Sequence, residues 1–163
     1  MAEAAVNPSH TAGGLPRAGI EVEMADEVNP VPTFSSNGEP LWTQGMCSCI
    51  CVATFDHEKL TRKRSLTHLR GEGRPSFFTA LAAEISPHTT VIVGSGKTNG
   101  KWWFESVIVA DIRAMLELAM RDAKKPTDNL QWLSLWTEND HQNGLLEGSF
   151  VIQGNGEYGR IKL

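Results

Sequence analysis

The chain has 163 residues, of which 40% are apolar and 21% are charged, which is typical of a single globular domain with its own core. Its formal net charge of -4 argues against nucleic-acid binding, because no basic face dominates. No apolar run approaches the roughly 18 residues that a membrane span needs, so no membrane span is predicted.

Residues 1–38 have the composition of a leader. They contain Pro8, Pro16, Pro30 and Pro32, with several Gly and Ser and no sustained apolar periodicity. We therefore predict a flexible leader, within which residues 19–24 are the one candidate for a short strand. The folded domain is predicted to cover residues 39–163.

Within residues 39–163, apolar periodicity and turn residues predict the order β-β-α-β-β-α-β-β-β. After a strand entry at 41–44, strands are expected at 49–55 and 65–69, a helix from Pro75 to a stop at Ser86-Pro87, strands at 89–93 and 101–109 joined by an Asn99-Gly100 turn, a helix at 110–123, and strands at 130–137, 150–153 and 158–162. The predicted fold class is α+β, a mixed β-sheet sandwich with two principal helices.

The three cysteines of the chain are Cys47, Cys49 and Cys51. Their number is odd, and neighbours at i and i+2 in an extended strand stand too far apart for an easy disulfide. They are expected to be reduced, which predicts a cytoplasmic location, or a host cytosol if the chain is an exported effector. C-x-C-x-C is also poor spacing for one metal ion, even with His57 or His68 added, so no metal site is predicted.

A Gly-Ser-Gly-Lys-Thr run at residues 94–98 invites comparison with a phosphate-binding loop. The phosphate-loop pattern needs a glycine where this chain has Val91, and it needs a helix directly afterwards, where this chain has a predicted turn. We therefore predict a turn after a buried strand, without nucleotide binding.

The predicted strands at 49–55 and 65–69 return a histidine, His68, toward Cys49. A thiol and an imidazole brought together across a hairpin are the minimum for thiolate attack on a carbonyl. From composition alone, the opposite interpretation stays open, in which the cysteines are small apolar residues packed in a core strand.

The segment Thr43-x-Gly45-x-x-Ser48-Cys49, followed by an apolar strand to Asp56 and then by His68, resembles the CheD family of chemotaxis-associated glutamine deamidases. That family shares its fold with the cytotoxic-necrotizing-factor toxins, and its segment reads T-x-G-x-G-S-C, then apolar residues to an Asp, then G-x-x-H. Cys47 replaces the family's glycine before Ser-Cys, and His68 comes slightly later in the chain.

This resemblance implies a CheD-like domain over residues 39–163 that hydrolyses a glutamine side chain on a target protein to glutamate and ammonia. Cys49 would be the nucleophile, His68 the acid/base and Thr43 the residue that orients the imidazole. Backbone N–H groups of Ser48 and Cys49 would hold the oxyanion. The resemblance implies a thioester intermediate, no cofactor, a protein substrate as partner, and a role in chemotaxis or as an effector or toxin.

Three alternatives use the same residues differently. A cysteine protease or a transglutaminase would use the same Cys–His dyad. A non-catalytic binding module would only pack its cysteines, and Trp102 and Trp103 would then mark its partner surface. Cys51 is a second candidate for the nucleophile, although Ser48-Cys49 fits the family pattern better.

Overall fold

The computed structural model describes residues 8–47, 49–58, 63–71, 73–95, 105–136 and 140–163. Its strands are β1 (Ile20–Glu21), β2 (Thr33–Ser35), β3 (Leu41–Thr43), β4 (Ile50–Asp56), β5 (Arg64–Leu69), β6 (Thr89–Ser95), β7 (Gln131–Leu135), β8 (Phe150–Ile152) and β9 (Tyr158–Gly159). Its α-helices are α1 (Pro75–Glu84) and α2 (Glu105–Asp122), and a 3-10 turn covers His141–Asn143.

The strands form two mixed sheets. The larger has the order β2-β5-β4-β6-β7, in which only the β6–β7 pair is parallel. The smaller has the order β1-β3-β8-β9, in which only the β1–β3 pair is parallel. The α+β class with two α-helices is therefore confirmed for the part of the chain that the structure describes.

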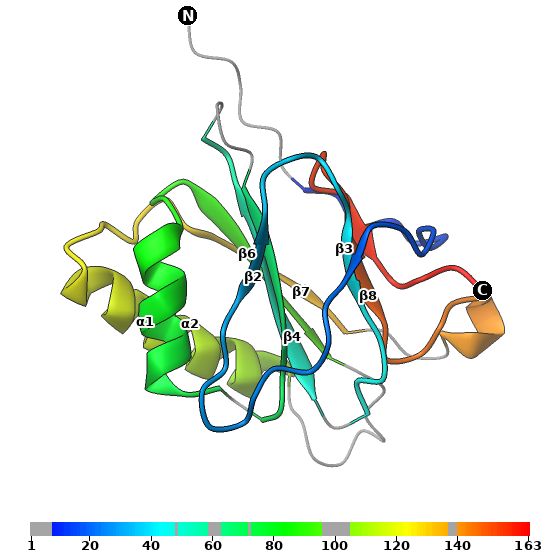
Figure 1. The fold of residues 1–163 in the computed structure, drawn as a ribbon, viewed down its shortest axis with the longest axis horizontal. Coiled ribbons are helices and arrows are strands. Elements are labelled where there is room, and N and C mark those ends of the chain that lie inside the picture. Colours follow the sequence, from blue (N-terminus) through cyan, green and yellow to red (C-terminus); the bar gives the residue numbers. More distant parts are fainter. Residues whose placement is uncertain (1–7, 48, 59–62, 72, 96–104, 137–139) are drawn as a thin grey trace, which may run out of the picture.

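The elements stack in three layers, with the larger sheet in the middle (Figure 1). Helices α1 and α2 cover one face of this sheet, and the smaller sheet, with β3 and β8, covers the other. Alternation along β4 explains the arrangement, because Ile50 and Val52 pack toward the helices while Cys51 and Ala53 pack between the sheets. A side chain between the sheets can therefore meet residues of both.

Most predicted elements match the structure to within a few residues, but the predicted strand at 101–109 is wrong where the structure describes it. Residues 105–109 form the start of α2, while residues 101–104 and the Asn99-Gly100 turn lie outside the described residues, as do Trp102 and Trp103. The β-branched Val107, Ile108 and Val109 suggested a strand. A four-residue repeat of buried side chains overrides that preference, with Ile108, Ile112, Leu116 and Met120 all on the inner face of the helix.

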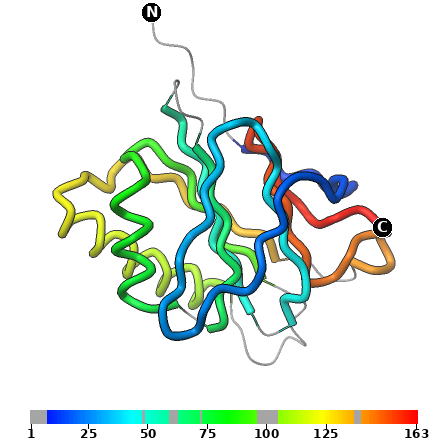
Figure 2. The backbone as a smooth tube through the Cα atoms, in the orientation of Figure 1, coloured from blue at the N-terminus to red at the C-terminus, as the bar shows by residue number. Residues whose placement is uncertain are grey.

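Residues 8–38 take part in both sheets instead of standing apart as a leader. Strand β1 pairs with β3, and β2 pairs with the outer edge of β5. Figure 2 shows this blue segment crossing the molecule from the smaller sheet to the edge of the larger one. The pattern was not visible in the sequence because these strands are only two and three residues long, too short to show a period.

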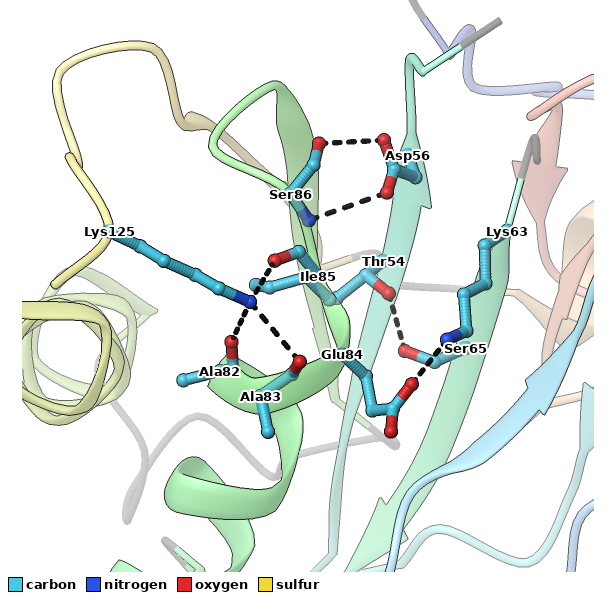
Figure 3. Close-up of polar contacts among 10 residues, drawn as sticks. All are labelled: Thr54, Asp56, Lys63, Ser65, Ala82, Ala83, Glu84, Ile85, Ser86 and Lys125. Atoms are coloured by element: carbon cyan, nitrogen blue, oxygen red, sulfur yellow. Dashed lines mark hydrogen bonds and ion pairs between the residues drawn. The ribbon is translucent and has the colours of Figure 1, made fainter. Parts of the chain in front are cut away.

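Polar contacts fasten the end of α1 to its surroundings (Figure 3). The Lys125 ammonium donates to the main-chain oxygens of Ala82, Ala83 and Ile85 at 2.7, 3.2 and 3.0 Å. The last carbonyls of a helix lack partners within the helix, and their partial negative charge favours a cation there. Lys125 therefore serves as a side-chain cap for α1.

We expect Lys125→Met to lower the free energy of unfolding by about 1–2 kcal/mol, because three carbonyl oxygens lose a charged donor. The matched control is Lys124→Met, which removes the same charge from an exposed neighbouring residue and should change stability by less than about 0.5 kcal/mol. Urea denaturation followed by circular dichroism measures both. Equal losses in the two variants would contradict the cap.

Of the helices in the described ranges, none is both long enough and apolar enough to cross a membrane.

Candidate active site

Thr43 and His68 meet between the two sheets. Thr43 ends β3 in the smaller sheet, and His68 lies near the end of β5 in the larger one. The Thr43 hydroxyl oxygen is 2.9 Å from His68 Nδ1, and the two residues are only 1% and 4% exposed. This hydrogen bond fixes the orientation of the imidazole ring.

The other ring nitrogen of His68 is available for chemistry. Nε2 is buried and has no hydrogen-bond partner among the described residues. A buried ring nitrogen without a partner among the described residues is a candidate position for a ligand or a reacting group. If Nδ1–H donates to Thr43, Nε2 carries the lone pair that a general base needs.

Cys49 lies just before β4, next to the end of the β4–β5 ladder that contains His68. Cys51 is directly opposite His68 in the antiparallel β4–β5 pair. Cys49 precedes Cys51 by two residues and lies just beyond the end of this ladder, where continuing the register would place it diagonal to His68. It is half-buried and packs against the cluster between the sheets, to which Cys51 also belongs. The fold thus brings the predicted nucleophile, base and orienting residue to one end of the intersheet space.

The Cys49 thiol points to Met24. Its Sγ is 4.0 Å from the Met24 Sδ, and among the contacts described it makes no hydrogen bond to His68. Met24 is itself paired with His68 in a parallel bridge, and the Ala25 N–H donates to the His68 carbonyl oxygen at 2.9 Å. The residues before β2 therefore lie across the site.

Burial shifts the pKa values of Cys49 and His68 in the directions that favour their uncharged forms. Burial raises the pKa of the Cys49 thiol, an effect that the nearby Arg70 guanidinium opposes and Cys47 reinforces. Burial also lowers the pKa of His68. Both shifts favour neutral thiol and neutral imidazole over the thiolate–imidazolium pair. Full burial raises the pKa of Cys51 to about 12, which makes it a poor nucleophile at neutral pH.

We expect the rate of Cys49 alkylation by iodoacetamide to keep rising with pH beyond the roughly 8.5 of a free thiol, because the raised pKa delays thiolate formation. Cys51 should stay unmodified throughout in the folded protein. Labelling across a pH series, resolved by residue with mass spectrometry, measures both. If the rate of Cys49 alkylation reached half its maximum at a pH well below the pKa of a free thiol, the raised pKa of Cys49 would be contradicted.

Other residues of the predicted motif lie elsewhere. Ser48 is outside the described residues. Asp56 is at the opposite end of β4, where it accepts hydrogen bonds from the Ser86 hydroxyl at 2.7 Å and from the Glu58 N–H at 2.8 Å (Figure 3 shows the contacts to Ser86). Asp56 therefore stabilises a turn and does not contact His68. Gly45 has a φ of 77°, a left-handed conformation that suits glycine in the turn between β3 and Cys49.

The cysteines do not assemble a metal centre with the candidate histidines. His57 is engaged at the far end of β4, with Nε2 2.7 Å from the Thr90 hydroxyl. Cys47 is exposed and lies outside any strand. Across the described ranges, no group of three or more His, Cys, Asp or Glu side chains is placed to hold a metal ion.

Sequence reasoning missed Met24, Ala25 and Arg70 as neighbours of the site. Ala25, Leu69 and Arg70 also line a hollow of about 200 Å³ together with Asp26, Glu27, Pro30, Gly73, Arg74 and Pro75. Only the position of Arg70 could have indicated this from the sequence. It comes two residues after His68, and side chains two residues apart in extended chain point to the same face. Met24 gave no such indication, because its contact depends on how a chain without periodic pattern crosses the sheets.

Neither a scan against protein-family models nor a search of the curated proteins finds a match to this chain.

Proposed function

We propose that this protein is a protein-glutamine deamidase in which Cys49 attacks the side-chain amide of a glutamine on a target protein. The observation that carries the proposal is the Thr43–His68 hydrogen bond, which leaves a buried, unpartnered Nε2 on the neighbour of Cys49. The CheD-like order of Thr43, Cys49 and His68 in the sequence supports the same assignment.

In the proposed reaction, His68 Nε2 takes the Cys49 proton as sulfur bonds to the amide carbon. The resulting oxyanion is stabilised by backbone N–H donors, each worth about 3 kcal/mol. The C–N bond then breaks, and imidazolium returns the proton so that ammonia leaves. Water, activated by His68, hydrolyses the thioester to glutamate and free thiol. Each turnover consumes one water and releases one ammonia, without a cofactor or metal.

Proton transfer during the attack fits the uncharged dyad. Because the shifted pKa values of Cys49 and His68 disfavour the ion pair, thiolate would form only as a substrate amide approaches. The reduced thiols suit a cytoplasmic location, or a host cytosol if the chain acts as an effector or toxin.

The raised pKa of Cys49 also favours a second candidate, a non-catalytic protein-binding module on the same scaffold. In that case Cys49 contributes only packing against the intersheet cluster and Met24. The two candidates differ in one measurable property, which is whether the thiol forms a covalent intermediate.

The test incubates the purified protein with a mixture of glutamine-containing peptides in ¹⁸O-labelled water. Deamidation converts the amide to a carboxylate, a gain of about 1 Da in ordinary water and about 2 Da more with the heavy oxygen. We expect such products from the wild type and none from Cys49→Ser. Peptide-bond cleavage would indicate a protease, and cross-linking to added amine a transglutaminase. If the peptides stay unchanged and Cys49 forms no covalent intermediate, the non-catalytic binding module is the remaining candidate.

A further inference from the structure

Residues 22–26, the covering segment, run as extended chain past the candidate site. The Val22 N–H donates to the Trp42 carbonyl oxygen at 2.7 Å, next to Thr43. The Ala25 N–H donates to the His68 carbonyl oxygen at 2.9 Å. The covering segment is therefore held by main-chain acceptors of β3 and β5, the two strands that supply Thr43 and His68.

Such main-chain acceptors bind an extended peptide without regard to its sequence. Addition of an extended segment to exposed strand groups is a common way in which proteins recognise peptides, and side-chain pockets then provide the specificity. The covering segment has this geometry, because Met24 forms a parallel bridge with His68 while its side chain reaches the thiol of Cys49.

The side chains of methionine and glutamine are the same from Cα to Cγ. The Sδ of methionine occupies the same place from Cα as the amide carbon of glutamine, although that carbon carries two further atoms where Sδ carries one. Met24 Sδ is 4.0 Å from Cys49 Sγ. Reacting atoms in a productive complex are roughly 3–3.5 Å apart, so an amide carbon at this position would need only a small approach.

We propose that the covering segment occupies the place where an extended segment of the substrate protein binds, with Met24 in the position of the target glutamine. This inference rests on the proposed function. It names the substrate as a glutamine presented on extended chain, and it gives the part of the covering segment around Met24 the role of an internal competitor that substrate must displace.

Val22 is buried in the cluster between the sheets, so the displaceable part of the covering segment is the part around Met24. Met24 is 50% exposed, and its contact with the thiol is a weak S–H···S interaction. A substrate strand that displaces Met24 and Ala25 would replace the Ala25 hydrogen bond to the His68 carbonyl oxygen with an equivalent one, so this exchange leaves the free energy nearly unchanged while Val22 stays packed. Beyond residue 26 the chain turns, because the Asp26 carboxylate accepts from the N–H groups of Val28 and Asn29.

The first test measures how fast iodoacetamide alkylates Cys49 at fixed pH. Met24→Ala should raise the rate roughly tenfold, because the thiol loses its cover and its contact. Val28→Ala is the matched control, since Val28 is an exposed apolar residue of the same loop without contact to the site among the described residues, and its rate should equal wild type. Equal rates in all three proteins would overturn the covering role.

The second test replaces Met24 by glutamine, which places the proposed substrate group beside the thiol. Met24→Gln should lead to conversion of the introduced glutamine to glutamate, a gain of about 1 Da in the peptide that contains it. The half-time should not depend on protein concentration, because the reaction is intramolecular. The same substitution combined with Cys49→Ser should stay unconverted, which excludes spontaneous deamidation.

The outcomes separate this inference from the proposed function. If the Met24→Gln protein deamidates the peptide mixture but leaves its own introduced glutamine intact, Met24 does not occupy the glutamine position and the inference is overturned. If Met24→Ala accelerates labelling while neither the introduced glutamine nor any peptide is converted, the covering role is supported and the deamidase proposal fails. Conversion of the introduced glutamine that requires Cys49 supports both.

Discussion

Arg160→Met is expected to lower the free energy of unfolding by about 3–5 kcal/mol, because it leaves the Asp140 carboxylate buried without its ionic partner. Arg160 and Asp140 are 0% and 2% exposed, and their Nε and Oδ2 atoms are 3.2 Å apart. The Arg160 guanidinium also donates to the Ser149 carbonyl oxygen at 2.7 Å. Urea denaturation of the variant beside wild type measures the loss.

Two further variants give the Arg160 result its meaning. Arg160→Met combined with Asp140→Leu should recover much of the lost stability, because an apolar pair of similar volume removes the buried charge. Arg121→Met breaks a surface pair between the exposed Arg121 and the half-buried Glu117, and it should cost less than about 1 kcal/mol. A loss for Arg160→Met as small as that for Arg121→Met would show that the buried pair contributes nothing beyond a surface ion pair.

His68→Ala is expected to reduce kcat/KM on the converted peptides by about 10²–10⁴-fold, since the reaction loses its only proposed proton acceptor. Thr43→Val keeps the imidazole but removes the oxygen that lies 2.9 Å from Nδ1. We expect a smaller loss for it, together with an altered pH profile, because the ring orientation is no longer fixed. Steady-state assays of ammonia release across pH measure both.

His57→Ala is the matched control for the His68 prediction. This variant removes another imidazole next to β4. The His57 imidazole is hydrogen-bonded to the Thr90 hydroxyl at the far end of that strand. The activity of His57→Ala should equal that of wild type, because His57 lies away from Cys49 and takes no part in the proposed proton transfer. Full activity in a correctly folded His68→Ala protein would remove His68 from the mechanism.

The central part of the fold was predictable from the sequence because its signals are local. β4 is a nearly continuous apolar segment that ends at Asp56, and its hairpin with β5 places Cys51 opposite His68 in register. The order of Thr43, Cys49 and His68 was enough to nominate the site. The Thr43–His68 bond then follows from β3 and β5 facing each other across the intersheet space.

The covering segment could not be predicted, because the hydrogen bonds that position it come from main-chain atoms. Val22 and Ala25 bond through their N–H groups, which any residue except proline possesses. The pairing of Met24 with His68 spans more than forty residues of sequence, and no local pattern encodes it. Asp56 is the opposite case. The resemblance to a family motif suggested that it belongs to the site, but its hydrogen bonds to Ser86 and Glu58 place it in a turn.

The N-terminal residues also bear on the order of events during synthesis. Thr11 and Leu15 donate main-chain hydrogen bonds to Tyr158 and Arg160, and the bridge between Leu15 and Ile161 is parallel. These partners leave the ribosome roughly 150 residues later, which at ~5–20 residues per second is a delay of roughly 7–30 s. The residues before β1 therefore lack these main-chain acceptors during that interval, whereas the acceptors of the covering segment, the Trp42 and His68 carbonyl oxygens, have already been made.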